Sequence, residues 1–247
     1  MVSLRRFFAR SEHPVARTVR TVYRGARSVS VPAPRAVVVP LRLAYVAARD
    51  AYDFSFRVLV AEPMFKAACK RYGRRLRTDN FIHWVQGSGD LIVGDDVAID
   101  GKCSFSFASR FSDHPTLEIG DRTEIGHDCT FTVAKAIRIG KRCRLSAGSW
   151  FFDSNGHPVH DAAARAAGAP PSDAEVRPIT IGDDVWIGGR CIIFPGTVIG
   201  DGCVISAGSI VRGTVPPYSL IAGNPAKKIA SLPRPDGRRA AEPEGSP

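Results

Sequence analysis

The side chains most able to transfer a proton are concentrated in one short segment, FFDSNGHPVHD at residues 151–161. It contains His157 and His160, three residues apart, and Asp153 lies upstream of both. Histidine has an ordinary pKa close to neutrality, so an imidazole here can act as a general base that takes a proton from a hydroxyl group. Each histidine can equally be a surface residue of a polar turn, and the segment alone does not decide between the two.

The other polar residues of this segment are also open to more than one interpretation. Asp153 is a candidate to orient the imidazole of His157 or to hold a substrate, and it is equally suited to forming a turn. Asn155 can contact a substrate or simply turn the chain. His160 competes with His157 as the base, because nothing in the spacing excludes it. The elements that position the segment must therefore be considered.

Large apolar residues recur every six positions on both sides of the segment. The longest unbroken run is Ile181, Ile187, Ile193, Ile199, Ile205 and Val211, and three shorter runs occupy positions 93, 99, 105, 111, then 119, 125, 131, then 139, 145, 151. A period of six fits neither a helix nor a simple alternating strand, but it suits a chain that turns a corner after each short strand. Three strands would close one triangular coil, with the eight-residue steps between runs forming a bulge at one corner. Glycine after the apolar residue, as in Ile119-Gly120, is expected to give the corner a positive φ.

The residue four positions after each large apolar residue is small. These positions are Val97, Cys103, Ser109, Thr123, Cys129, Cys143, Ser149, Val185, Cys191, Thr197, Cys203, Ser209 and Val215. A small residue that shares the inward face with a large one fills a narrow prism, so five of the six cysteines are predicted to be buried packing residues. No CxxC spacing occurs, and neither disulfides nor a metal site are expected. Free thiols fit a reducing compartment.

The six-residue phase stops after Phe151 and resumes at Ile181. His157 stands where the next inward apolar residue should be, and a histidine inside the prism would be a poorly satisfied polar group. The chain is therefore expected to leave the coil in a loop at 152–178, whose length is typical of a functional or disordered segment. The first part of this loop holds the candidate base, and the alanine-rich remainder is typical of a cover or spacer.

The sequence RPITIGDDVWIGGRCIIFPGTVIGDGCVISAGSIVRGTVPPYSLIAGNPAKKI at 177–229 carries the motifs VWIG and AGNPAK. Through these motifs and the repeat, residues 90–232 resemble the hexapeptide-repeat acyltransferases, and within them the sugar and glycan O-acetyltransferase branch that includes maltose, galactoside, capsule and lipopolysaccharide O-acetyltransferases. Residues 62–90 also resemble the lead-in segment of members associated with surface-glycan modification. The resemblance implies a mainly β fold, a left-handed parallel β-helix, and transfer of an acyl group, expected to be acetyl, from acyl-CoA to a sugar hydroxyl.

The resemblance also implies a mechanism. The family uses a histidine followed by proline as the general base, and GHP places His157 at that position. The backbone N–H after WIG stabilises the oxyanion, and here that residue is Gly189, where the family often has serine. Direct attack without a covalent intermediate is implied. The implied assembly is a homotrimer, with acetyl-CoA bound as co-substrate along the β-helix between two subunits.

Positions that bind the acyl-CoA follow from the same resemblance. Ala207 in SAG and Arg212 in IVRG match positions that line the pantetheine and nucleotide portions. Lys227 and Lys228 stand where basic side chains meet the phosphates, and their other interpretation is an ordinary solvated C-terminal helix. His127 in IGHDC is either a surface residue or a residue that faces the active-site groove and contacts substrate.

Two other functions compete with acyl transfer. A non-catalytic hexapeptide scaffold that binds a partner through its basic arm would use the same repeat. A zinc enzyme like the carbonic anhydrases of this fold would need His127, His157 and His160 together, which requires the loop to fold back. We expect no resident metal or cofactor.

The first third of the chain is strongly basic. Residues 1–80 hold 17 Lys/Arg against 5 Asp/Glu, whereas residues 81–247 hold 17 against 19. HPVARTVRTVYRGAR has valines at helical spacing, and EPMFKAACKRYG has Pro63 in its first turn and Gly73 after its end, so both predict helices. The basic helix is expected either to contact an anionic membrane or to pack against the trimer. Nucleic acid is not expected, because aromatic and basic residues are not interleaved.

The predicted organisation has three parts. Residues 1–80 form a basic, largely helical extension, residues 81–232 form the left-handed β-helix domain and end in a short helix, and residues 233–247 form a disordered tail. The sequence has no apolar run of about 20 residues and no signal peptide. A cytoplasmic protein is therefore expected, peripheral at the inner face of the membrane if the basic extension binds lipid.

Overall fold

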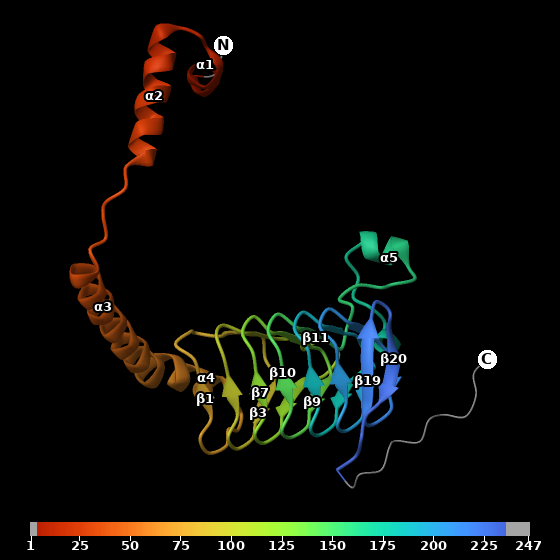
Figure 1. Ribbon diagram of the computed structural model, residues 1–247. Helices are drawn as coiled ribbons and strands as arrows, with labels where there is room; N and C mark the ends of the chain where they lie inside the picture. The colour runs from red at the N-terminus through yellow and green to blue at the C-terminus, as the bar shows by residue number, and fades with distance from the viewer. Residues whose placement is uncertain (1–3, 236–247) are drawn as a thin grey trace. The chain divides into compact units, whose positions relative to one another are not determined.

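The computed structural model describes residues 4–235 in two compact units, which divide between Ala51 and Tyr52. The tail that was predicted to be disordered comprises residues 233–247, and from position 236 onward it lies outside the described residues. The secondary structure of the first unit is helical, and the second unit contains three β-sheets (Figure 1).

The N-terminal extension is helical, as predicted. Its helices are α1 at Leu4–Arg10, α2 at Pro14–Ser28 and α3 at Arg35–Phe56. α2 covers the predicted basic helix, with the side chain of His13 accepting a hydrogen bond from the backbone N–H of Val15 at 3.3 Å. Among residues 4–235, none of the helices combines the length and apolarity that crossing a bilayer requires.

The second predicted helix is present but shorter than expected. A π-helical turn at Arg57–Ala61 leads into α4 at Glu62–Ala68, with a proline in its first turn as predicted. The helix ends five residues before Gly73, because Cys69 is extended and Lys70 already donates its N–H to the carbonyl of Leu91 at 2.9 Å. The chain thus joins the first coil of the sheets before reaching the glycine.

The sheets form the three faces of a prism. Face 1 has β1 Arg77–Thr78, β4 Ala98–Ile99, β7 Glu124–Ile125, β10 Arg144–Leu145, β13 Trp186–Ile187, β16 Val204–Ile205, β19 Ser219–Gly223 and β20 Ala226–Ser231. Face 2 has β2 Trp84–Gln86, β5 Ser104–Phe107, β8 Thr130–Val133, β11 Trp150–Phe152, β14 Ile192–Ile193 and β17 Ile210–Val211. Face 3 has β3 Asp90–Val93, β6 Thr116–Ile119, β9 Ala136–Ile139, β12 Ile179–Ile181, β15 Val198–Ile199 and β18 Thr214–Val215.

From β1 to β19, strands that are neighbours on a face pair in parallel, each with the strand one coil further along the chain (Figure 1). Ile187 pairs with Ile205 on face 1, and Ile193 pairs with Val211 on face 2. The six-residue repeat is therefore one side of a coil, and three sides bring the chain back beneath its own start. This confirms the predicted left-handed parallel β-helix.

The interior follows the predicted large and small alternation. On face 2 the rings of Phe105, Phe131 and Phe151 stack with centroids 5.4 and 4.9 Å apart. The small residues between large ones are buried, including all five cysteines that were assigned to packing. Ser109 and the apolar Phe111 are exceptions, because β5 ends at Phe107 and the corner before β6 is a longer loop.

The glycines after the apolar residues do not have the positive φ that was expected. The left-handed conformation occurs two residues later instead, at Asp96, Arg122, Arg142 and Asp184. Glycine is needed for another reason: a Cβ on Gly120 would lie 2.6 Å from the carbonyl carbon of Gly140 in the next coil. Close stacking of successive coils excludes a side chain there.

The predicted short C-terminal helix is wrong, since residues Ala226–Ser231 form strand β20. The chain reverses at Gly223, with φ 104°, and Pro225, and β20 then pairs antiparallel with β19. The hydrogen-bonding edge of β19 would otherwise be unpaired at the end of the sheet, and β20 covers it. Lys227 pairs with Ala222 across the two strands.

The first coils of the prism are covered by an aromatic cluster. Phe65 of α4 is 2% exposed, and its ring centroid lies 4.8 Å from that of His83 and 5.4 Å from that of Phe105. The Nδ1 atom of His83 accepts a hydrogen bond from the N–H of Cys103 at 3.2 Å, while its buried Nε2 atom has no partner among the described residues. Burial lowers the pKa of His83 to about 4.

This histidine predicts an acid-sensitive contribution to stability. Below its ordinary pKa near 6.5 the unfolded chain binds the proton and the folded chain does not, so the free energy of unfolding should fall as the pH drops from about 6.5 to about 4. A decrease on the order of 3 kcal/mol is expected from this group. Urea unfolding across this range should have a shallower pH slope in His83→Phe, and an unchanged slope would contradict the assignment.

Candidate active site

The predicted loop leaves the prism between β11 and β12, at the corner that joins face 2 to face 3. It contains α5 at Ala162–Ala166 and a 3₁₀ turn at Asp173–Glu175. Figure 1 shows it projecting from the otherwise regular stack of coils. The coil resumes at Ile179, which pairs with Ile137 below it. The interruption therefore leaves the stacking of the sheets intact.

Asp153 anchors the start of the loop to the coil below. Its side chain is fully buried, and its carboxylate accepts hydrogen bonds from the backbone N–H groups of Ala134, Lys135 and Ala136 at 2.7, 2.7 and 2.8 Å. Burial raises the pKa of Asp153, and the three backbone donors oppose that effect. Of the interpretations open for this residue, the geometry favours turn formation: the carboxylate secures a corner rather than the imidazole of His157.

The alanine-rich part of the loop holds the GHPVH segment in place. The Glu175 carboxylate accepts hydrogen bonds from the N–H of Val159 at 2.9 Å and from Ser172, and the Arg165 guanidinium donates to the carbonyls of Pro158 and Val159, both at 2.8 Å. Residues 158–159 are thus bound from both sides. Sequence reasoning treated this part as spacer, and a lone Arg and Glu among alanines was the only signal available.

His157, His160 and Asn155 are all exposed on this loop. Neither imidazole makes a hydrogen bond to any residue in the described part of the chain, so each is free to contact a substrate. Pro158, which follows His157, is buried and is itself one of the held residues. The structure therefore presents the two candidate bases on either side of the held residues: His157 precedes Pro158, whose carbonyl accepts from Arg165, and His160 follows Val159, whose N–H and carbonyl are both hydrogen-bonded.

Gly189 lies at a different corner, where face 1 passes into face 2. Corner residues are stacked there, since Arg190 donates its N–H to the carbonyl of Ala147 and Gly208 donates to that of Gly189, both at 2.9 Å. The N–H of Gly189 itself makes no hydrogen bond within residues 4–235. It is available to stabilise an anion.

Ala207 and His127 belong to the same corner column as Gly189. Gly148 donates to the carbonyl of His127 at 2.9 Å, which places His127 one coil below Ala147. His127 lines a surface hollow together with Asp79, Phe81 and Lys102. This position is compatible with the prediction that His127 faces a groove.

A second hollow lies on face 1, and it includes Ser146, whose Cβ would lie 4.0 Å from a Cβ placed on Gly189. It is lined by Asp100, Glu124, Arg144, Ser146 and Trp186 among others. The indole N–H of the exposed Trp186 donates to Ser146 Oγ at 3.3 Å. The W of VWIG was recognised only as part of a motif, and its place beside the corner could not be read without the coil register.

The predicted acyl-CoA residues divide between the two corners. Lys227 and Lys228 pair with Ala222 and Ile221, so β20 runs beside the continuation of the Gly189 column. Arg212 instead follows β17 at the loop corner, where its guanidinium lies 3.5 Å from the ring centroid of Phe194. Phe194 in turn packs on Phe152 at 4.8 Å.

The zinc alternative finds no support in the geometry. Within residues 4–235, no three histidine, cysteine or acidic side chains are grouped as metal ligands. His127 belongs to the face 1–2 corner, and the two loop histidines belong to the face 2–3 corner. Because the chain places these histidines at two different corners of the prism, they are not grouped as a zinc ligand set.

Comparison with known proteins agrees with the fold and the motifs. Residues 117–150 and 178–212 match the family described as hexapeptide repeat of succinyl-transferase. The chain is 31% identical over 163 residues to an Escherichia coli K12 protein, WbbJ, that is named as a lipopolysaccharide biosynthesis O-acetyl transferase, and the alignment covers 63% of this chain and 79% of that protein. This chain belongs to the hexapeptide-repeat acyltransferase family.

Other members are more distant or matched over less of their length. The galactoside O-acetyltransferase of the same bacterium is 32% identical over 140 residues. This alignment covers 57% of this chain and 63% of that relative, so the chain spans less than two thirds of the relative's length. Among solved structures of the fold, a mutant of the Bacillus cereus N-acyltransferase AntD, in complex with dTDP-4-amino-4,6-dideoxyglucose and coenzyme A, superposes with a TM-score of 0.57 at 19% identity, over 70% of this chain and 89% of AntD. The superposition shows that AntD and this chain share a fold.

The anchoring role of Asp153 is testable through stability. Asp153→Asn should lower the free energy of unfolding by roughly 2–3 kcal/mol, because an amide offers only one acceptor oxygen to three buried backbone donors. Asp161→Asn is the matched control, since Asp161 caps α5 by accepting from Ala164 N–H and asparagine caps equally well. Urea unfolding measures both, and equal stability of the two variants would contradict the anchor.

Proposed function

We propose that this chain is an acetyl-CoA-dependent O-acetyltransferase that acts on a hydroxyl of a sugar or surface-glycan acceptor. The observation that carries the proposal is the anchored loop, which presents an exposed His157 in a GHP sequence at the side of a hexapeptide prism. The relation to an O-acetyltransferase named for lipopolysaccharide biosynthesis and to a galactoside O-acetyltransferase supports a glycan hydroxyl as acceptor.

In the proposed reaction His157 takes the proton from the acceptor hydroxyl while that oxygen attacks the thioester carbonyl of acetyl-CoA. The carbonyl oxygen becomes an oxyanion, which the N–H of Gly189 stabilises; one such donor contributes about 3–4 kcal/mol to lowering the barrier. The C–S bond then breaks, and the CoA thiolate recovers the proton from the His157 imidazolium. The products are the acetylated glycan and CoA.

A covalent acetyl-enzyme is not part of this mechanism. The cysteine nearest to Gly189 in the sequence is Cys191, which is fully buried, and burial raises the pKa of its thiol. Cys143 is buried as well, and burial raises its pKa to about 11. A buried, protonated thiol is a poor nucleophile. These free thiols also support the proposed cytoplasmic location.

The active site is proposed to lie between two copies of the chain in a homotrimer. His157 and Asn155 leave the prism at the face 2–3 corner, whereas Gly189, Ala207, Lys227 and the nearby His127 follow the face 1–2 corner. A neighbouring copy can bring its Gly189 corner to the loop. Acetyl-CoA would then lie between the copies, with its pantetheine beside Ala207.

The basic side chains are proposed to hold the phosphates of the co-substrate. Lys227 and Lys228 on β20 offer point charges beside the Gly189 column. Arg212, stacked on Phe194, offers a planar guanidinium near the loop corner. At a two-copy interface these groups approach from both sides of the nucleotide.

We also propose that the N-terminal extension contacts the inner face of the membrane peripherally. Its basic helices would bring the enzyme to a lipid-linked glycan acceptor. The excess of Lys/Arg in residues 1–80, 17 against 5 Asp/Glu, supports attraction to an anionic surface.

His157→Ala should lower kcat by about 10²- to 10⁴-fold with little change in KM for acetyl-CoA, because the base acts in the transition state and does not bind the thioester. His160→Ala is the matched control and should stay within a few-fold of the parent. CoA release, followed with a thiol-reactive chromophore and a glycan acceptor, measures both. Full activity of His157→Ala would exclude it as the base, and the reverse pattern would assign the role to His160.

A mixed assembly tests whether the site is shared. Gly189→Pro removes the N–H donor, and His157→Ala removes the base, so each variant alone should be inactive. Chains of the two variants assembled together should regain about a quarter of the parent activity if each site takes its base and its donor from different copies. Gly189→Ala keeps the N–H and serves as the steric control. No recovery on mixing would place both groups in one chain.

A further inference from the structure

We propose that the helical hairpin formed by α1 and α2 is a docking surface for an anionic phospholipid bilayer. The inference rests on the proposed peripheral membrane contact and assigns that contact to one part of the extension, with separate roles for its apolar and its basic side chains. The partner chemistry is a layer of phosphate groups above a layer of acyl chains.

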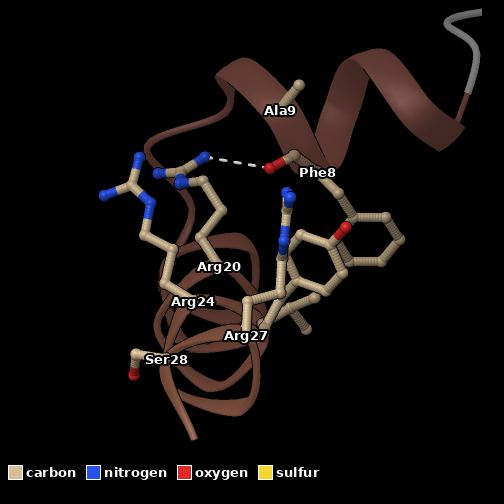
Figure 2. A pocket seen from close by; sticks show the side chains of 8 residues that line it. Phe8, Ala9, Arg20, Arg24, Arg27 and Ser28 are labelled. Carbon is tan, nitrogen blue, oxygen red and sulfur yellow. Dashed lines mark hydrogen bonds between the residues drawn. The ribbon is translucent and has the colours of Figure 1, made fainter. Parts of the chain in front are cut away.

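The hairpin is internally well defined. The Arg20 guanidinium of α2 donates hydrogen bonds to the carbonyl of Phe8 at 3.1 Å and to that of Ser11 at 2.8 Å, and so caps the end of α1 (Figure 2). Ala16 of α2 is fully buried. The hairpin therefore holds its side chains in a fixed arrangement, and Arg20 is committed to that arrangement.

The apolar side chains of α2 are left in water. Val15, Val19, Val22 and Tyr23 are 54, 42, 65 and 60% exposed, and Ala16 is the buried residue of the helix. Val19 and Tyr23 also line a hollow with Phe8 and Ala9 of α1. Apolar surface of this kind gains free energy when it leaves water, so the hairpin is suited to a partner with an apolar layer.

The same hollow has a basic rim. Arg24 and Arg27 line it beside the aromatic rings, and neither forms an ion pair with a carboxylate in the described part of the chain (Figure 2). The Arg27 guanidinium lies over the Tyr23 ring, 5.6 Å from its centroid. A guanidinium binds a phosphate through two parallel hydrogen bonds while its alkyl stem stays on apolar surface.

The charge of the surrounding chain selects an anionic surface. Residues 1–51 contain ten arginines, no lysine and two acidic residues, Glu12 and Asp50. Arginines at the rim and aliphatic side chains in the hollow match the order of layers at a bilayer surface, with phosphates outside and acyl chains beneath. A nucleic acid would need open aromatic faces for its bases, and the Arg27 guanidinium already lies over one face of the Tyr23 ring.

The test uses the full chain and sedimentation with vesicles. Vesicles of phosphatidylcholine alone are compared with vesicles containing about 30% phosphatidylglycerol, at low and at about 0.5 M salt. Arg24→Glu with Arg27→Glu tests the rim, and Val19→Ser with Val22→Ser tests the apolar face. Arg110→Glu with Arg138→Glu is the matched control, because it makes the same change in net charge on the prism.

The full chain should bind the anionic vesicles and not the neutral ones. The rim variant should bind at least about tenfold more weakly than the prism control. The valine variant should lose the binding that the parent retains at high salt, since apolar insertion is not screened. Turnover of acetyl-CoA with a soluble acceptor should be unchanged in both hairpin variants.

The outcomes separate this inference from the proposals it rests on. Binding by the parent that is unaffected in both hairpin variants would overturn the hairpin assignment and leave membrane contact in place elsewhere on the chain. Absence of vesicle binding by the parent, including the case where it binds a duplex DNA probe instead, would overturn membrane contact as well. If the parent chain does not turn over acetyl-CoA with a glycan acceptor, acyl transfer is refuted, and the vesicle-binding results for the parent and for the hairpin variants still stand.

Discussion

The stacking of successive coils through parallel strand pairing is the constraint on which the rest of the β-helix depends. Paired strands lie about 4.8 Å apart, so each inward side chain meets the residue at the same position in the next coil. A large residue must then be followed by a small one within the narrow prism, and a glycine must stand where two backbones meet, as at Gly120 and Gly140. The same spacing brings Phe105, Phe131 and Phe151 into one stack. Sequence, interior packing and corner geometry thus have a single cause.

A loop can leave such a stack only if the coil on either side remains paired and the broken corner is satisfied. Asp153 meets the second requirement, because its buried carboxylate takes the place of the backbone groups that the missing corner would have offered to Ala134, Lys135 and Ala136. Glu175 and Arg165 then organise the loop from within. Asp153, a candidate to orient His157, therefore acts on the scaffold, and the residues that hold the chain between the two histidines come from further along the sequence.

The fold was predictable because a six-residue period is a direct consequence of the coil geometry. The loop was predictable for the same reason, since His157 falls on an inward position that cannot accept it. A repeat cannot reveal contacts between residues that lie outside the six-residue pattern. Examples are the hydrogen bond from the N–H of Val159 to Glu175 and the packing of Phe65 and His83 over the first coils. The C-terminal helix was wrong because AGNPAKKI has no periodic signal of its own, and the free edge of β19 decides its conformation. The VWIG motif identified a position but not its neighbour Ser146, which lies one coil below.

The regularity of the solenoid also limits where chemistry can arise within one chain. Along the face 1–2 corner the stacked residues His127, Ala147, Gly189 and Ala207 share one backbone geometry, so the free N–H of Gly189 is not made special by its coil. It is distinguished by what adjoins it, namely the hollow with Trp186 and Ser146 on one side and the strand carrying Lys227 on the other. The anchored loop leaves from another corner, and no stacking of regular coils can bring it back to Gly189. A base that must reach that amide is therefore most simply supplied by a second copy of the same chain, which turns a repetitive surface into a specific site without disturbing the repeat.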